Sequence, residues 1–315
     1  MSAAASGEVP RSQYGTITLI CNSRSGNGGV GKALPEVEKH LKLRELPYEV
    51  FHTERAGHAT LLAREALERG SRFLVAVGGD GTVHEVVNGM IENDQAVNPD
   101  AVLGVVAAGS GCDFIKTFGI PSMPAHAVSH LDGDGSFSID IGKVTFMKDG
   151  VETVRYFPNI AEVGMGAATV GVAAKMPRWF GPTIYFFAFW LTLFTHKAAN
   201  VVVDLVDKKY EGPMNNMVIA NGQFFGGGMK IAPKAAPTDG LLDIQVEHAK
   251  KRESVAIMPK VYKGQHVPHP DILEAKRVRC SITSERPLPV EADGELLGQT
   301  PASFEVLKDI IRLKV

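Results

Sequence analysis

The segment Gly78-Gly79-Asp80-Gly81-Thr82 combines small residues with one acid, a composition that suits contact with a phosphate group. Glycines allow the backbone to turn sharply and approach phosphate oxygens, and backbone N–H groups at the start of a helix attract negative charge. The Asp80 carboxylate would repel a phosphate unless a metal ion or a proton transfer involved it. The segment therefore predicts a phosphate site that uses Mg²⁺ or base catalysis, with a plain Gly-Asp-Gly turn as the alternative.

A second loop, residues 22–29, is rich in asparagine, serine and glycine. Unpaired N–H groups and small side chains allow such a loop to approach a phosphate closely. Residues 26–32 nearly complete a P-loop, but Ala33 stands where a Mg²⁺-binding hydroxyl is required. The loop therefore favours phosphate contact without a P-loop metal site, and a surface turn is the alternative.

A third loop, residues 107–114, repeats the pattern of small residues followed by an acid, here Asp113. A further acid, Asp140, ends another apolar run. Asp80, Asp113 and Asp140 can face one pocket if these runs are neighbouring strands, and three converging carboxylates are costly without a divalent cation. An isolated surface aspartate is the alternative for each.

The elements that must position these loops form a regular pattern in the first half of the chain. Short β-rich runs alternate with segments of helical period, which predicts a parallel sheet crossed by helices. Ligands bind beyond the carboxyl ends of the strands in such sheets, where these loops lie. The predicted strands are residues 17–20, 48–52, 73–77 and 102–106, and the predicted helices cover residues 30–41, 59–67 and 83–91.

The second half of the chain has a different pattern, in which strand-like runs are separated by many Gly and Pro residues. We predict a mostly antiparallel, β-sandwich-like domain, with the active site in the cleft between the two domains. Helices are expected near residues 180–194 and 253–262. The expected strands are 137–144, 201–206, 217–220, 241–246 and 278–282, and the expected organisation is 1–13 disordered, 14–141 α/β, 142–300 β-rich, and 301–315 returning to the first domain.

Composition narrows the class of partner. The 315 residues are 44% hydrophobic and carry a net charge of −2, so the chain has no general attraction to nucleic acid. The three cysteines are scattered and odd in number, which favours a reducing, cytoplasmic location. The apolar run 179–194 is shorter than the roughly 20 residues that span a bilayer, so we expect a buried helix or a lipid-facing surface.

A series of motifs along residues 14–315 resembles the diacylglycerol kinase catalytic family, which includes sphingosine, ceramide and small bacterial lipid kinases. The motifs are NSRSG, GGDGT followed by HEVVNG, GSGCDFIKTFGIP, SIDIGKV, ANGQFFGGGMKIAPKAAPTDGLLDI and VEADGE. The resemblance implies an ATP-binding first domain, a lipid-binding second domain, and transfer of the γ-phosphate of ATP to a lipid hydroxyl with Mg²⁺. Diacylglycerol is the expected acceptor, and a sphingoid base or ceramide is the alternative.

The resemblance also implies roles for single residues. Asp80, Asp113 and Asp140 match a water- and Mg²⁺-linked network, and Asp239, with the carbonyls of Ala236 and Leu241, matches a structural Mg²⁺ site. The positions that match nucleotide-binding residues are Asn22, Ser25, Gly26, Thr53, Gly78, Gly79, Asp80, Gly81, Thr82, Gly109, Ser110 and Asp113.

The proton-accepting residue has two candidates. Asp293, with Glu295 close by, matches the general base proposed for bacterial diacylglycerol kinases, whereas sphingosine kinases suggest Asp80. We favour Asp293 as the base and Asp80 on the metal and phosphate side. One departure from the family is Cys112, which stands where Asn is usual and is a poor hydrogen-bond donor.

Two rival functions remain. An NAD kinase shares GGDGT but does not account for GSGCDF, FFGGGM or PTDGLLD, and an inactive nucleotide- or lipid-binding regulator is suggested only by Cys112. For a lipid kinase, the run 179–194 is expected to line the acyl-chain pocket or touch the membrane surface, with Lys175, Arg178 and Lys197 as basic anchors. The sequence does not indicate an oligomeric state.

Overall fold

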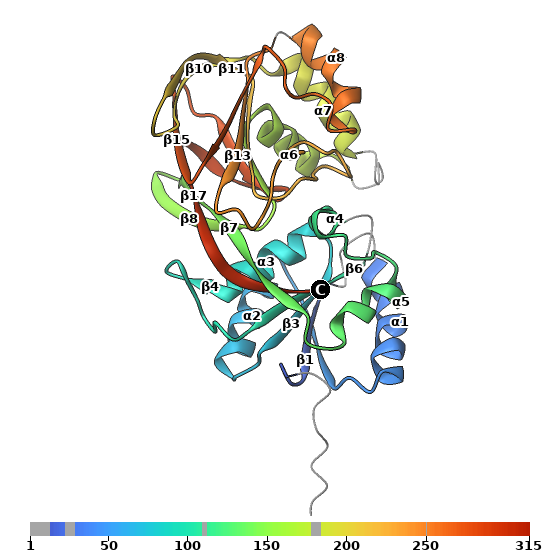
Figure 1. Ribbon diagram of the computed structural model, residues 1–315. Helices are drawn as coiled ribbons and strands as arrows, with labels where there is room; N and C mark the ends of the chain where they lie inside the picture. The colour runs from blue at the N-terminus through green and yellow to red at the C-terminus, as the bar shows by residue number, and fades with distance from the viewer. Residues whose placement is uncertain (1–12, 23–28, 109–111, 178–183, 250) are drawn as a thin grey trace, which may run out of the picture.

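A computed structural model describes residues 13–22, 29–108, 112–177, 184–249 and 251–315. The chain forms two stacked lobes (Figure 1). Two long strands, β7 (Ser136–Lys148) and β17 (Glu295–Lys314), pair with each other and run through both lobes. The last residues of β17 lie beside β6, where Arg312 pairs with Val102 in parallel. The chain therefore returns to the amino-terminal lobe before it ends.

The amino-terminal lobe contains a parallel sheet with the strand order β6-β3-β1-β2. Its helices cross from each strand to the next, as the sequence predicts. The α/β prediction is therefore confirmed. The elements are β1 (Ile17–Cys21), α1 (Gly29–Leu43), β2 (Tyr48–His52), α2 (His58–Glu68), β3 (Phe73–Gly78), α3 (Asp80–Met90) and β6 (Val102–Ala107).

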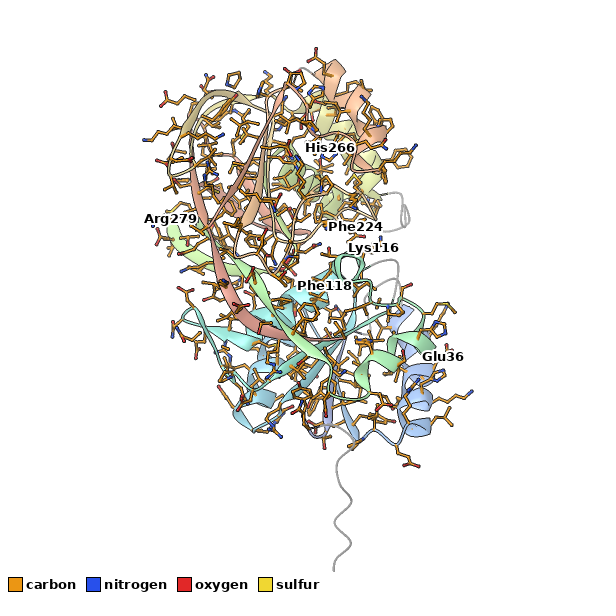
Figure 2. The ribbon with its side chains drawn as sticks, viewed as in Figure 1. Glu36, Lys116, Phe118, Phe224, His266 and Arg279 are labelled. Atoms are coloured by element: carbon orange, nitrogen blue, oxygen red, sulfur yellow. The ribbon has the colours of Figure 1, made fainter. Side chains whose placement is uncertain are left out.

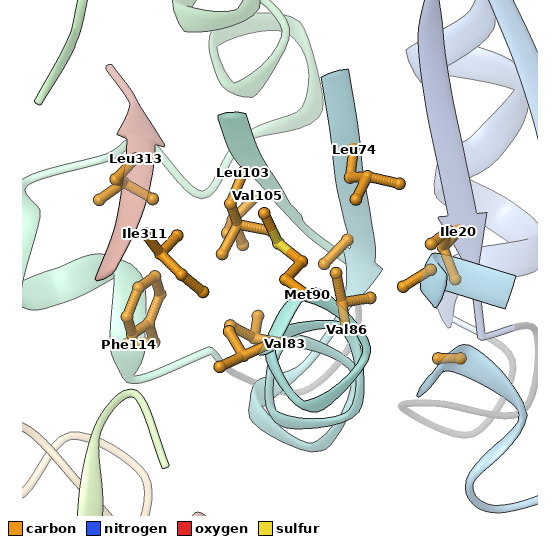
Figure 3. Packing of buried hydrophobic residues seen from close by; sticks show 14 of the residues in the cluster. Ile20, Leu74, Val83, Val86, Met90, Leu103, Val105, Phe114, Ile311 and Leu313 are labelled. Carbon is orange, nitrogen blue, oxygen red and sulfur yellow. The ribbon is translucent and has the colours of Figure 1, made fainter. Parts of the chain in front are cut away.

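Helix α3 packs on one face of this sheet. Val83, Val86 and Met90 lie on one side of the helix and point toward the strands (Figure 3). They form a cluster with Leu74 of β3 and Leu103 of β6. Alternate residues of these strands belong to a second buried cluster with α1, so both faces of the sheet are covered. Burial on both faces explains why these strands read as continuous apolar runs.

The predicted end of α3 at Ile91 is wrong. The helix ends at Met90, and Ile91 begins β4 (Ile91–Glu92), which pairs with β5 (Gln95–Ala96). The connection uses Asn93 and Asp94, both with positive φ, a conformation that these two residue types tolerate better than most. The local turn therefore overrides the apolar period.

The carboxyl-terminal lobe is a β-sandwich with helices on one side, which confirms the predicted fold class. Apolar side chains from β10 and β15 meet those from β9, β12 and β13 in a single core. Helices α6 and α7 pack on each other, and α6 contacts β9 and β16. The elements are β8 (Val151–Phe157), β9 (Ile160–Gly164), α6 (Met165–Lys175), α7 (Ile184–Thr195), β10 (Ala199–Asp204), β11 (Lys209–Met214), β12 (Asn216–Ala220), β13 (Leu242–Glu247), α8 (Lys251–Val261), β14 (Ile272–Arg277), β15 (Arg279–Ser284) and β16 (Pro289–Ala292).

Short helical elements connect β6 to β7. Helix α4 (Phe114–Phe118) follows β6, and α5 (Pro124–Ala127) and a 3₁₀ turn (Ser129–Leu131) lead into β7. Figure 2 shows Lys116 of α4 at the boundary, close to Phe224 of the carboxyl-terminal lobe. Helix α4 is therefore the part of the amino-terminal lobe that meets the glycine-rich segment after β12.

Candidate active site

The loops with predicted chemistry gather at one edge of the parallel sheet. Cys21 pairs with both His52 and Val77, and Val77 pairs with Val106, so the ends of the four strands lie level. This register brings Asn22, Thr53 and the loop 78–82 to the same edge. The predicted nucleotide-binding residues Ser25, Gly26, Gly109 and Ser110 lie outside the described residues.

The GGDGT loop is closely packed. The backbone N–H groups of Thr82 and Val83 both donate to the carbonyl of Gly79, which begins α3. Thr82 is buried, and a Cβ added to Gly78 would collide with its hydroxyl, so this position requires glycine. A Cβ added to Gly81 would lie 3.8 Å from Glu295 Oε1 of the other lobe. The loop therefore faces the acids that follow β16.

Asp80 binds the start of α4, and no cation of the described residues forms an ion pair with it. Its carboxylate accepts hydrogen bonds from the backbone N–H groups of Asp113 (3.0 Å) and Phe114 (2.9 Å) and from the thiol of Cys112 (3.6 Å). Burial raises the pKa of Asp80 to about 6, although the two amides oppose the shift, and the charges of Asp113 and Asp293 add to it. Ionisation of the Asp80 carboxylate, beside the phosphate loop, is therefore less favourable than in water.

Cys112 makes the contact at the position where Asn is usual. Its burial raises the pKa of the thiol well above its ordinary value, so the thiol keeps its proton and can donate to Asp80. The sulfur–oxygen distance of 3.6 Å and the weakness of a thiol donor make this hydrogen bond weaker than that of an amide. Cys112 therefore still donates a hydrogen bond to Asp80, but a weaker one than an amide would make.

Asp293 lies in the two-residue turn between β16 and β17. Ala292 pairs with Glu295, and Asp293 and Gly294 both have positive φ, at 50° and 86°. An Asp-Gly pair is the usual sequence for such a hairpin turn. The Asp293 Oδ1 atom accepts hydrogen bonds from the backbone N–H groups of Asn159 (3.2 Å) and Ile160 (2.9 Å). The turn therefore fixes the Asp293 carboxylate against the start of β9.

His84 is a site residue that the sequence analysis did not identify. It lies one helical turn after Asp80, on the same face of α3. Its Nδ1 atom is 2.9 Å from Asp293 Oδ2, and its Nε2 atom is 3.9 Å from Glu295 Oε2. Burial lowers the pKa of His84. The hydrogen bond to Asp293 and the charges of Asp293 and Glu295 outweigh this effect, so the pKa is raised. An imidazole thus joins the two lobes at the turn.

Glu295 is the accessible acid of this group. Its side chain is 44% exposed, whereas that of Asp293 is 1% exposed. Burial of part of the side chain raises the pKa of Glu295, and the His84 charge opposes the shift. Asp80, His84, Asp293 and Glu295 therefore form one group at the boundary of the two lobes.

Among the described residues, Asp80, Asp113 and Asp140 each bind a different segment of the chain, and their predicted network near the phosphates stays a prediction. The Asp113 carboxylate accepts hydrogen bonds from the N–H groups of Gly227 (2.7 Å) and Gly228 (3.2 Å) and pairs with Lys116. The Asp140 carboxylate accepts from the N–H groups of Gly240 and Asp309. Among the described residues, no three His, Cys, Asp or Glu side chains gather as metal ligands. Asp113 joins the lobes and Asp140 holds a bend of β17.

The residues predicted to hold a structural Mg²⁺ do not fit such an ion as they are arranged. Asp239 accepts from the Leu241 N–H group, and its other oxygen is 2.9 Å from Lys276 Nζ. Lys276 also lies 3.0 Å from Asp243, close enough for an ion pair but not aligned as a hydrogen bond. The carbonyl of Ala236 accepts from the N–H groups of Thr238 and Asp239. The Lys276 ammonium therefore supplies the positive charge here.

Known protein families match both lobes. The model of the diacylglycerol kinase catalytic domain matches residues 16–144. The model of the YegS C-terminal NAD kinase beta sandwich-like domain matches residues 159–315.

Proteins named diacylglycerol kinase match nearly the full length. The protein from Staphylococcus haemolyticus is 31% identical over 92% of this chain and 85% of its own length. That from Staphylococcus epidermidis is 31% identical over 94% and 90%, respectively. Two solved structures described as putative diacylglycerol kinases from Bacillus anthracis share the fold, with TM-scores of 0.74 and 0.73 at 23% identity, and each covers 96% of this chain and 97% and 96% of its own. The chain belongs to the diacylglycerol kinase family.

Proposed function

We propose that the protein transfers the γ-phosphate of ATP to the hydroxyl group of a lipid, with diacylglycerol as the acceptor. The observation that carries this proposal is that the phosphate loop and the Asp293 turn, from different lobes, lie close together. The GGDGT loop of one lobe faces Glu295 of the other, and His84 is hydrogen-bonded to Asp293. Phosphoryl transfer requires this arrangement because the nucleotide and the acceptor hydroxyl must meet in line.

The nucleotide side is the edge formed by the loops after β1, β2, β3 and β6. Backbone N–H groups at the start of α3 suit phosphate oxygens, and Asn22 and Thr53 are suitably placed for the ribose and phosphates. Ser25, Gly26, Gly109 and Ser110 complete this side in the proposal. Helix α3 would stabilise negative charge on the phosphates through its N-terminus.

Asp80 is the residue that would hold Mg²⁺ brought in with ATP. Burial raises the pKa of this carboxylate to about 6, and a bound cation would offset that cost. Mg²⁺ would neutralise charge on the phosphates during transfer. Asp113 and Asp140 would contribute only through the backbone that they hold.

The acceptor side is the turn that carries Asp293 and Glu295. We assign the proton-accepting role to Asp293, whose Oδ2 atom has His84 as its one donor among the described residues and so keeps a lone pair. His84 orients this oxygen, and Glu295 lies between it and the GGDGT loop. A carboxylate that orients and deprotonates the hydroxyl is the role that such transfer requires of the protein.

Helix α7 supplies the surface for a lipid substrate. Apolar side chains are exposed along it, at Tyr185 (52%), Phe187 (46%), Leu191 (52%) and Phe194 (70%). None of the helices within the described ranges is long and apolar enough to cross a bilayer. We propose that α7 rests on the cytoplasmic surface of the membrane and that Lys175 and Lys197 contact lipid headgroups. Arg178, a third predicted anchor, lies outside the described residues.

Vesicle binding tests the α7 surface. Phe187→Ser and Phe194→Ser should each reduce co-sedimentation with anionic phospholipid vesicles several-fold, and solution ATP affinity should not change. Leu43→Ser is the matched control, because Leu43 is 69% exposed but lies on α1 of the other lobe. Equal binding by all three variants would contradict the proposed surface.

Transfer of labelled γ-phosphate from ATP tests the function itself. Diacylglycerol, a sphingoid base, ceramide and NAD should be offered separately, with Mg²⁺ present. We expect label in diacylglycerol. Label in the sphingoid base or ceramide would move the assignment to that lipid class, and label in NAD would overturn the lipid assignment. ATP binding without label in any acceptor would identify an inactive regulator.

A further inference from the structure

A pair of glutamates is buried beneath helix α6, beside the catalytic turn. Glu162 of β9 and Glu291 of β16 lie directly opposite each other in the antiparallel register. Their side chains share one face of the sheet, and opposed residues have Cβ atoms about 4.5–5.5 Å apart. Glu162 is 4% exposed and Glu291 is 0% exposed. Two carboxylates buried at this separation cannot both ionise at low cost.

The hydrogen bonds of the pair leave one carboxyl oxygen unsatisfied. Glu162 Oε1 accepts from the side-chain amide of Asn216 at 2.8 Å, and Glu291 Oε2 accepts from the Gly294 N–H group at 2.8 Å. Glu291 Oε1 is buried and has no hydrogen-bond partner in the described part of the chain. A proton between the two carboxyl groups would give this oxygen its partner.

The surroundings of the pair are acidic. The charge of Glu247, at the end of β13, raises the pKa of Glu162. The charges of Asp293 and Glu295 raise the pKa of Glu291. Burial, and then the charges of Glu291 and Asp80, raise the pKa of Tyr185 on α7. Helix α6 covers the pair so closely that a Cβ on Gly166 would collide with Glu162, and α6 has no charged residue before Lys175. No described cation forms an ion pair with either glutamate.

The titration of both groups agrees with this geometry. Burial raises the pKa of Glu162 to about 7. Burial, and then the charge of Glu162, raises the pKa of Glu291 well above its usual range. Since the two groups interact, protons leave the pair in two steps that belong to both residues. One proton therefore remains on the pair in the neutral range.

We propose that Glu162 and Glu291 hold one proton between them at neutral pH and that this shared proton keeps the Asp293–Gly294 turn in its working position. The link is the hydrogen bond from Gly294 to Glu291, which fixes the residue next to the base. Loss of the shared proton would leave two carboxylates in repulsion and draw Glu291 away from Gly294. Glu291 and Glu162 are positioning residues, because they act on the acceptor side through the turn. The catalytic consequence rests on the proposed function, but the shared proton does not.

Infrared difference spectra test the proton without any assay of activity. At pH 7.5, the wild-type spectrum minus that of Glu162→Gln should contain the C=O stretch of a protonated carboxylic acid, and so should the difference with Glu291→Gln. The new amide can donate the hydrogen bond that the proton supplied, so the remaining glutamate ionises. Glu152→Gln, at an exposed position of β8, should give no such band. Absence of the band from the first two differences would overturn the shared proton.

Stability provides a second readout in case one variant folds poorly. A group whose pKa is raised in the folded protein contributes stability at low pH that is lost as the pH rises through the folded value. The wild type should therefore lose stability as the pH rises from about 4.5 toward 7 and above, and each Gln variant should lose less. Identical slopes for wild type and both variants would also contradict the shared proton.

The pH profile of lipid phosphorylation tests the link to the turn. Wild-type kcat should fall on the alkaline side, and the fall should move to higher pH in both single Gln variants, while KM for ATP should not change. An unmoved alkaline fall in both variants would overturn the positioning role. A protein without kinase activity would leave the infrared result intact, so failure of the proposed function is distinguishable from failure of this inference.

Discussion

The carboxylates of Asp80 and Asp293, which come from different lobes, accept hydrogen bonds from different kinds of donor. Asp80 follows a parallel strand and accepts hydrogen bonds from two amides and a weak thiol donor. Asp293 lies in a hairpin turn and accepts from two amides and the His84 imidazole. Within the described ranges, Asp80 has no cationic partner, whereas Asp293 is hydrogen-bonded to a histidine whose pKa is raised.

This difference suits the two acids to different roles in phosphoryl transfer. A buried carboxylate without a cation is suited to receive one together with a phosphate. A carboxylate that is oriented by an imidazole is suited to hold an oxygen in place for proton transfer, as in other histidine–carboxylate pairs. The comparison therefore favours Asp80 on the nucleotide side and Asp293 on the acceptor side.

Asp80→Asn should have the largest effect. We expect turnover to fall by roughly 10²–10³-fold, the usual effect of losing one major electrostatic contact to a reacting phosphate or oxyanion. The Mg²⁺ concentration required for half-maximal rate should rise. Because the pKa of Asp80 is raised from 3.8 to about 6, wild-type stability falls as the pH rises through that interval, and this fall should disappear in the variant.

Steady-state kinetics at several Mg²⁺ concentrations and denaturant unfolding measure these effects. Asp100→Asn is the matched control, because Asp100 is exposed in a loop of the same lobe. An unchanged Mg²⁺ requirement in Asp80→Asn would place the cation elsewhere and remove the basis of the comparison.

His84→Gln should have the next largest effect, a fall in kcat of roughly tenfold to a hundredfold, because it removes the orienting imidazole. The pKa of His84 is raised above 6.5, so its pairing with Asp293 stabilises the fold fully below that pH and less as the pH rises through the folded value. The variant should lack this pH-dependent part of the unfolding free energy.

Chemical unfolding between pH 5.5 and 9 tests the His84 prediction, with His126→Gln as the control at an exposed position of α5. The same pH dependence in wild type and His84→Gln would mean that the imidazole does not titrate with the turn. Asp293 would then have to act without it.

Asp113→Asn should have a smaller effect, because it weakens the contact between α4 and the turn at Gly227 and Gly228. Hydrogen bonds to a charged group contribute about 1.5–3 kcal/mol, and Asn keeps one acceptor oxygen, so we expect a loss of about 1 kcal/mol. Faster amide hydrogen exchange at Gly227 and Gly228 would show it. Asp149→Asn, in an exposed turn of the other lobe, is the control, and unchanged exchange would exclude Asp113 as a link between the lobes.

Cys112→Asn should have the smallest effect. The amide is a stronger donor to Asp80 than the thiol, so the pKa of Asp80 should fall and KM for ATP should change by only about twofold to threefold. Cys112→Ala removes the donor and should raise the pKa of Asp80 instead. A rise in both variants, measured by the pH dependence of ATP binding, would contradict the thiol contact.

Sequence periodicity predicted the amino-terminal lobe well, because its strands are buried on both faces and its helices present one apolar side. The strand ends at Cys21, Gly78 and Ala107 were therefore located to within one residue. The carboxyl-terminal lobe was less accessible to prediction. Helix α6, with small apolar residues on every side, and strand β17, with a bend at Asp309, show no clear period.

The acids of the site show the same limit. His84 could have been found, because a residue one turn after Asp80 on a predicted helix shares its face. The pair Glu162 and Glu291 could not, since their juxtaposition depends on the register between two strands far apart in the chain. The sequence also did not show that amide groups of other segments surround the carboxylates of Asp113 and Asp140.

Single-turnover transfer of labelled γ-phosphate to diacylglycerol by Asp293→Asn, with ATP affinity measured on the same preparation, tests the central assignment most directly. We expect a chemical step slower by roughly 10²–10⁴-fold, the usual contribution of a general base, with the Kd for ATP unchanged. Transfer at the wild-type rate, or a loss of transfer matched by an equal loss of ATP binding, would contradict the assignment of Asp293 to the acceptor side.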